Sequence, residues 1–162
     1  LGFQALFISV ISFALASLSL AVFYPKVSVK ASFPLNARNI LSTQFTILND
    51  SIIAIKNVKV SVSISRITTS DGATIDGGSS FEARLREPNS LENKDVTSLG
   101  AGETNTVQFP QSFNVGDNVN FVDMAIVVCF ESLFWSRERL SRFVTVMDTE
   151  GSLHWKSEPL AK

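Results

Sequence analysis

Residues able to perform acid–base, nucleophilic or metal chemistry are few in this chain and lie far apart. His154 is the only histidine and Cys129 the only cysteine, which excludes multi-histidine or cysteine-based metal sites and the usual Ser-His-Asp triad. The carboxylates are scattered among Lys and Arg, and the glycine pairs do not follow the GxGxxG spacing of a phosphate-binding loop. The sequence therefore predicts a protein that is not an enzyme, with no catalytic residue, no cofactor and no bound metal.

The segment FVDMAIVVCFE, residues 121–131, contains two residues that chemistry could use. Nothing cationic flanks Cys129 to lower its pKa, and we predict that it is a small buried core residue. Alternation places Asp123 on the same strand face as Val127 and Cys129. If that face is buried, Asp123 needs a charged partner, and an arginine is the obvious one.

Aromatic and basic residues gather in one short stretch, FWSRER, residues 134–139. Adjacent aromatic side chains cannot all point inward on a strand, so part of this stretch is expected at the surface beside two guanidinium groups. Such a composition is enriched in interface hot spots. We predict contact with a partner subunit or a lipid headgroup surface through Tyr24, Phe134, Trp135, Arg137 and Arg139. Core filling by Trp135 beside solvated arginines is the alternative.

The first 23 residues, LGFQALFISVISFALASLSLAVF, carry no charge. A helix of this length spans about 34 Å, close to the hydrocarbon thickness of a bilayer. Tyr24 suits the membrane–water interface, Pro25 ends the helix and Lys26 marks the return to water. We therefore predict a single-pass transmembrane helix over residues 1–24.

Small side chains recur along this predicted helix at Ser9, Ser12, Ala16 and Ser19. The spacing places them on one stripe, which lets another helix approach closely. The alternative is that serine and alanine are simply common in membrane helices.

The remaining residues, 25–162, predict one β-rich domain. All 14 Lys and Arg and all 15 Asp and Glu follow Pro25, and this near balance gives no basic field for nucleic acid. Strict alternation in VKVSVSIS predicts a half-buried strand, and turn residues separate the other candidates. Residues 131–142 are predicted as a helical turn or a charged hairpin, and 87–99 as a contact loop or a solvated excursion. The predicted strands are 27–32, 43–49, 58–65, 80–86, 104–109, 121–131, 142–147 and 153–155.

Two stretches carry a resemblance: TQFTILNDSIIAIKNVKVSVSI and SLGAGETNTVQF. They resemble the early strand pair and mid-domain turn of immunoglobulin-like sandwiches in bacterial surface and cell-envelope proteins. With PKVSVKASFPLNAR and RFVTVMDTEGSLHW, the whole chain resembles bacterial single-span membrane proteins that have one such domain. A weaker resemblance is to archaeal type IV pilins and archaellins. The resemblance implies a transmembrane helix at 1–24, followed by an immunoglobulin-like antiparallel β-sandwich at 25–162, with no catalytic residues.

Together these observations predict a membrane-anchored, non-catalytic accessory or structural subunit that stabilises a larger membrane protein complex. Respiratory or photosynthetic complexes are the expected host class, and the expected partners are their other subunits and the lipid bilayer, without nucleic acid. The alternative is a pilin-like filament subunit with the apolar helix in the filament core. The resemblance places the β-domain on the extracytoplasmic side, whereas Lys26, Lys30 and Arg38 after the span favour the cytoplasm.

Overall fold

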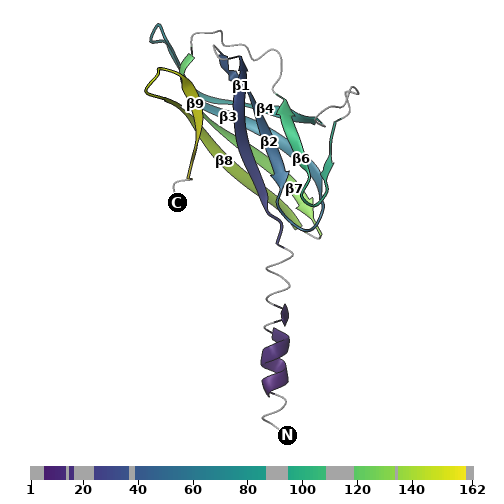
Figure 1. The fold of residues 1–162 in the computed structure, drawn as a ribbon. Coiled ribbons are helices and arrows are strands. Elements are labelled where there is room, and N and C mark those ends of the chain that lie inside the picture. Colours follow the sequence, from purple (N-terminus) through teal and green to yellow (C-terminus); the bar gives the residue numbers. More distant parts are fainter. Residues whose placement is uncertain are drawn as a thin grey trace.

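The computed structural model describes residues 6–13, 15–16, 24–36, 39–86, 95–108, 119–133 and 135–159. Residues 6–13 and 15–16 are helical, and they lie beyond one end of a β-rich body (Figure 1). The strands of this body are β1 (Val27–Asn36), β2 (Asn39–Asn49), β3 (Ile55–Thr69), β4 (Thr74–Arg86), β5 (Ser98–Leu99), β6 (Thr104–Gln108), β7 (Val119–Ser132), β8 (Trp135–Met147) and β9 (Leu153–Glu158).

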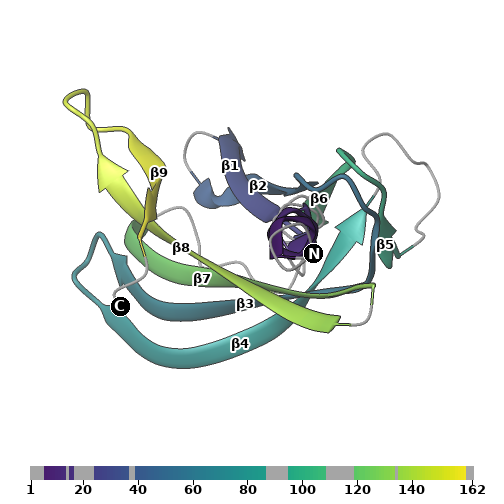
Figure 2. The same ribbon diagram turned by 90° about the horizontal axis from the view of Figure 1, so that it is seen from below.

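All these strands belong to one antiparallel sheet in the order β1-β2-β6-β4-β3-β7-β8-β9, with β5 paired to β3. The sheet is strongly curved, so β1, β2 and β6 face the layer of β3, β7 and β8 (Figure 2). Near the open side β1 approaches β8, and the sheet is almost closed on itself. The core fills the space between the two facing parts.

Alternation along the long strands explains why they bury one face. In β3 the side chains of Val60, Val62 and Ile64 are buried, whereas the residues between them are partly or fully exposed, as period-two patterning predicts. Across the core, the Phe45 ring on β2 packs edge-on against Phe143 on β8 at 5.0 Å between ring centroids. Phe45 and Phe143 therefore hold the two facing parts of the sheet together.

The predicted immunoglobulin-like sandwich is wrong, because the strands do not form two separate sheets. The first part of β4 pairs with β3, from Thr74 to Ala83, and its last residues, from Arg84, pair with β6. One bent strand thus joins the two facing layers. A strand that changes partner along its length makes the sheet continuous, where the sandwich requires two sheets packed face to face.

The predicted transmembrane helix over residues 1–24 is also wrong as judged from the described residues. Among them, no helix is both long enough and apolar enough to cross a membrane. The predictions of a single-pass membrane protein and of an extracytoplasmic β-domain held by that span are corrected by the same finding. The remaining positions of the predicted span, 1–5, 14 and 17–23, lie outside the described residues.

Each predicted strand overlaps an observed one, but most observed strands are longer. The segment 131–142 is a hairpin between β7 and β8 rather than a helical turn, and Leu133 at its tip has a φ of 53°. Of the predicted loop 87–99, Ser98 and Leu99 form β5, and residues 87–94 lie outside the described part. The short β5 was not predicted.

Candidate functional site

The helical segment, residues 6–13 and 15–16, exposes its large apolar side chains. Their exposed fractions range from 44% for Ile11 to 76% for Phe13. Proteins seldom leave such a contiguous apolar surface in water unless it is a contact surface. The exposed apolar residues of this segment are Leu6, Phe7, Ile8, Val10, Ile11, Phe13 and Leu15.

Three of the predicted helix-packing residues, Ser9, Ser12 and Ala16, are helical and exposed in this segment. Ser19 lies outside the described residues. At about 100° per residue, Ser9, Ser12 and Ala16 fall within a sector of about 60°, and the large apolar side chains occupy the rest of the circumference. The segment therefore has one narrow small-residue face, and its packing against another helix stays a prediction.

The structure brings three of the predicted contact residues together at the end of the sheet nearest the helical segment. The Arg137 guanidinium carbon lies 5.1 Å from the centroid of the Tyr24 ring and 5.5 Å from that of the Trp135 ring. Both are within the range of cation–π attraction. Tyr24, Arg137 and Arg139 line a hollow at this end of the sheet, and Phe134 lies outside the described residues.

Local structure explains this cluster, which we call the Arg137 cluster (Tyr24, Trp135, Arg137 and Arg139). Strand alternation puts Arg137 and Arg139 on the same face of β8 as Phe143, which is buried. Near the hairpin, however, this face extends past the core. Tyr24 lies three residues before Val27, the start of β1, and β1 approaches β8, so the Tyr24 ring reaches Arg137.

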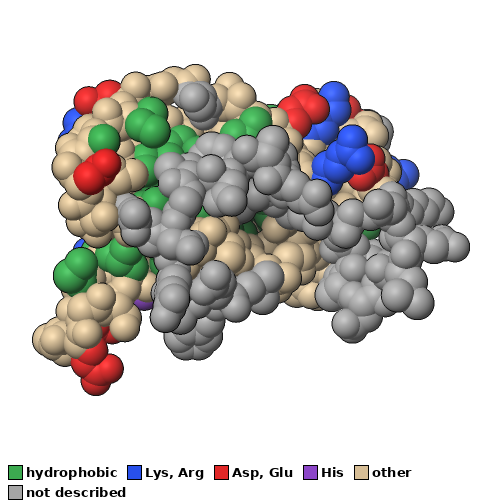
Figure 3. All heavy atoms as spheres, turned by 90° about the horizontal axis from the view of Figure 1, so that it is seen from above, with side chains coloured by type: hydrophobic (Ala, Val, Ile, Leu, Met, Phe, Trp, Pro, Cys, Tyr) green, Lys and Arg blue, Asp and Glu red, His purple; other side chains and the backbone are tan. Residues whose placement is uncertain are grey.

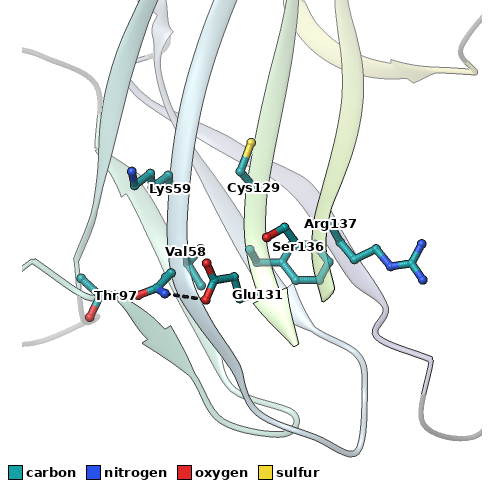
Figure 4. Close-up of a pocket in the computed structure, with 9 residues that line it drawn as sticks. Val58, Lys59, Thr97, Cys129, Glu131, Ser136 and Arg137 are labelled. Carbon is teal, nitrogen blue, oxygen red and sulfur yellow. Dashed lines mark hydrogen bonds between the residues drawn. The ribbon is translucent and has the colours of Figure 1, made fainter. Parts of the chain in front are cut away.

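A second hollow of about 420 Å³ lies on the outer surface beside the β7–β8 hairpin (Figure 4). Cys129 and Lys59 stand on adjacent strands there, and the Asn57 side-chain amide donates a 2.6 Å hydrogen bond to Glu131. The prediction that Cys129 is buried is wrong, because it is exposed. Its neighbours Val128 and Phe130 take the inward positions.

Asp123 lies on the outer face of β7 but is largely buried there, and it has the predicted arginine partner. Arg142 donates two hydrogen bonds to its carboxylate, Nε to Oδ1 at 2.9 Å and Nη2 to Oδ2 at 2.6 Å. These bonds, the negative charge of Asp123 and that of Glu158 raise the pKa of Arg142. Because such a bidentate pair links β7 and β8 in one register, we assign Asp123 a structural role.

The same outer face carries charges of alternating sign across the strands. The β-sheet register sets Asp76 opposite Arg66, and Arg66 opposite Asp123. Arg66 Nε also donates to Asp76 Oδ1 at 2.7 Å. Opposite charges on directly paired residues stabilise a sheet modestly, and this row favours the observed register.

Chemistry elsewhere in the described residues is sparse. No group of three or more His, Cys, Asp or Glu side chains in the described ranges could hold a metal ion. The Thr69 hydroxyl and the Ala73 amide donate to Asp71 and lower its pKa, at the exposed tip of the β3–β4 hairpin. His154 is exposed on β9. At the end opposite the helical segment, acidic and basic side chains lie next to one another (Figure 3).

Sequence reasoning missed some residues of the Arg137 cluster's hollow. Lys26 and Asp50 line it, and neither carries a local signal that points to β8. Comparisons of the chain with protein families, with curated proteins and with solved structures find no match. These comparisons therefore do not test the resemblance to single-span envelope proteins or the resemblance to pilins.

Proposed function

We propose that this protein is a non-catalytic structural subunit that works by contact, with its helical segment buried against the helices of neighbouring protein chains. The observation that carries this proposal is the exposure of seven large apolar side chains on residues 6–15. They surround most of the helix circumference, so one flat contact leaves part of them in water. Several neighbouring helices at once bury them all.

The energy available from this contact is large. Full burial of one such side chain contributes about 1.5–3 kcal/mol, and at their observed exposure seven of them contribute roughly 7–13 kcal/mol in total. Association costs on the order of 4–15 kcal/mol in lost translational and rotational freedom. Burial of the helical segment is thus of the same magnitude as the cost of association, and the narrow face of Ser9, Ser12 and Ala16 admits the closest neighbour.

The body of the protein supports the non-catalytic part of the proposal. Asp71 and Arg142 have shifted pKa values. Asp71 sits at a hairpin tip and Arg142 in a structural ion pair, whereas catalytic groups with perturbed pKa values usually converge in a cleft. The curved sheet is then a rigid body that the subunit presents to its neighbours.

The leading form of this proposal is an accessory subunit, whose helical segment is buried by unlike chains of a larger complex. The second form is a filament of identical copies with the helical segments in its centre. Two observations favour considering it: the large apolar side chains surround most of the helix, and the segment lies beyond the end of the sheet (Figure 1), where the body leaves room for neighbouring helices.

Site-specific photo-crosslinking in the native assembly tests the proposal. A benzophenone amino acid replaces Ser12 or Ala16, and mass spectrometry identifies the crosslinked chain. One foreign partner supports the accessory subunit, and a ladder of self-crosslinks supports the filament. The matched control replaces Ser65, which is exposed on β3, and we expect far less crosslinking there. Equal yields at Ser12, Ala16 and Ser65, or no protein crosslinks at all, would contradict the proposal.

A further inference from the structure

The Arg137 cluster borders a hollow of about 340 Å³ between the start of β1 and the hairpin end of β8. The ring of Tyr24 lies on the Arg137 guanidinium at 5.1 Å and that of Trp135 at 5.5 Å. These rings orient the guanidinium and restrict its rotamers. Its Nε atom is buried and has no hydrogen-bond partner among the described residues, and an unsatisfied buried donor is costly.

Positive charge in this hollow is unpaired. Lys26, Arg137 and Arg139 line it, and no ion pair of the described residues includes any of the three. Three arginines elsewhere in the sheet, Arg66, Arg84 and Arg142, each have a carboxylate partner. In the hollow, by contrast, Arg137 and Arg139 have no ion-pair partner among the described residues.

We propose that this hollow binds a carboxylate presented by a partner protein, with Arg137 as the residue that receives it. The two terminal amino groups of the planar Arg137 guanidinium, Nη1 and Nη2, match the two oxygens of a carboxylate. Arg139 lies two residues further on the same strand face and adds a second positive charge at about 7 Å. This site goes beyond the proposed function, because it does not depend on burial of the helical segment.

Charge balance favours a carboxylate over a phosphate. Asp50 and Glu138 also line the hollow, so its three basic and two acidic groups give a net charge of +1. A monoanion neutralises this charge. A dianionic phosphate is repelled by the two neighbouring carboxylates and leaves the site with excess negative charge.

Nuclear magnetic resonance of the whole chain tests the site with small peptides as probes. Acetyl-Gly-Glu-Gly-amide presents a side-chain carboxylate, acetyl-Gly-Gly-Gly with a free terminus presents a terminal one, and acetyl-Gly-Gln-Gly-amide presents none. We expect saturable shifts of the Trp135 indole N–H and the Arg137 Nε–H signals with one or both of the acidic peptides. Comparison of the two acidic peptides identifies the source of the carboxylate. The glutamine peptide should leave these signals unchanged.

Variants separate the site from general charge effects. Arg137→Gln should weaken peptide binding at least about tenfold, because hydrogen bonds to charged groups contribute that much. Arg137→Lys keeps the charge and loses the fork, so it should weaken binding less than Arg137→Gln. Arg66→Gln, which alters a paired arginine on the outer face, should bind as the unaltered chain does. Spectral dispersion reports that each variant is folded.

Three results would overturn the proposal. The first is equal binding of the glutamate and glutamine peptides. The second is binding by folded Arg137→Gln that equals binding by Arg66→Gln. The third is tighter binding of inorganic phosphate than of either acidic peptide, which would assign the hollow to a phosphate ligand. Because these measurements follow signals of Trp135 and Arg137 in the body, failure here leaves the crosslinking result at Ser12 and Ala16 intact.

Discussion

Asn49 organises the turns at the end of the sheet nearest the helical segment, and its replacement by aspartate is the sharpest test of the fold. The side chain is fully buried. Its Nδ2 donates to the carbonyl oxygens of Ile53 at 2.8 Å, Leu99 at 3.1 Å and Gly100 at 2.9 Å. Its Oδ1 accepts from the amide and the hydroxyl of Ser51. One side chain therefore joins the β2–β3 turn to the β5–β6 turn.

Asn49→Asp has almost the same shape as the original residue but cannot donate when ionised. The two N–H donors that the amide shares among three carbonyl oxygens are lost, at about 1 kcal/mol net for each donor. The new carboxylate oxygen faces three carbonyl oxygens, and burial of an unpaired charge adds several kcal/mol before relaxation. We expect the free energy of unfolding to fall by about 4–6 kcal/mol, a large part of the 5–15 kcal/mol typical of a domain.

Urea unfolding followed by tryptophan fluorescence measures this change. The matched control is Asn120→Asp, the same chemical change at an exposed position on β7, which should alter the free energy of unfolding by no more than about 0.5 kcal/mol. If Asn49→Asp costs less than about 1 kcal/mol and resembles Asn120→Asp, the hydrogen bonds of Asn49 do not hold the two turns together, and the reasoning is refuted.

Two further predictions concern the closure of the sheet and a hairpin tip. The Trp155 indole N–H donates to Thr43 Oγ1 at 2.8 Å and to Ile40 O at 3.3 Å across the core. Trp155→Phe should therefore lower the free energy of unfolding, measured in urea titrations, by about 1–2 kcal/mol. An unchanged free energy of unfolding would mean that these bonds do not stabilise closure of the sheet. The Thr69 hydroxyl and the Ala73 amide hold the pKa of Asp71 below 3.8, so this carboxylate adds stability above pH 3.8 that disappears as the pH falls through the folded pKa. In Thr69→Val the pKa of Asp71, read from its carboxyl carbon resonance, should rise towards 3.8, and an unchanged pKa would contradict the assignment.

The strands were predictable from sequence because their signal is local. Apolar residues alternate with polar ones at Val58, Val60, Val62 and Ile64. Only a strand places all of these apolar side chains on one buried face and the polar ones on the exposed face. The pairing of the strands, however, was not predictable. The exchange of partners along β4, from β3 to β6, joins segments far apart in sequence, and period-two patterning says nothing of it. The immunoglobulin-like sandwich was therefore wrong although the strands were found.

The outward position of Cys129 shows a second limit. In β7 both alternating sets contain apolar residues, with Ala125, Val127 and Cys129 on one face and Met124 and Ile126 on the other. Composition alone does not decide which face is buried when both are apolar. The partner of Asp123 was still predictable, because a carboxylate within an apolar strand needs an opposite charge.

The candidate contact site was predicted in part. Trp135 and Arg137 were found because adjacent aromatic and basic residues on a strand cannot all be buried. Contact between Tyr24 and Arg137 joins the segment before β1 to β8, far away in the strand order, and no local pattern encodes it. For the helical segment, the absence of charge led to a transmembrane helix, which the described residues do not contain. The exposed apolar surface of that segment is the feature that remains to be explained.

Protection of the helical segment in the native assembly tests the central claim most directly. In a Cys129→Ser background, Val10→Cys places one thiol among the exposed apolar side chains, and Met147→Cys places one at the opposite, exposed end of the body. Maleimide labelling rates are compared between the native assembly and the purified isolated chain. The account predicts strong slowing at position 10 in the assembly and none at position 147. Equal rates at position 10 in both states would contradict it.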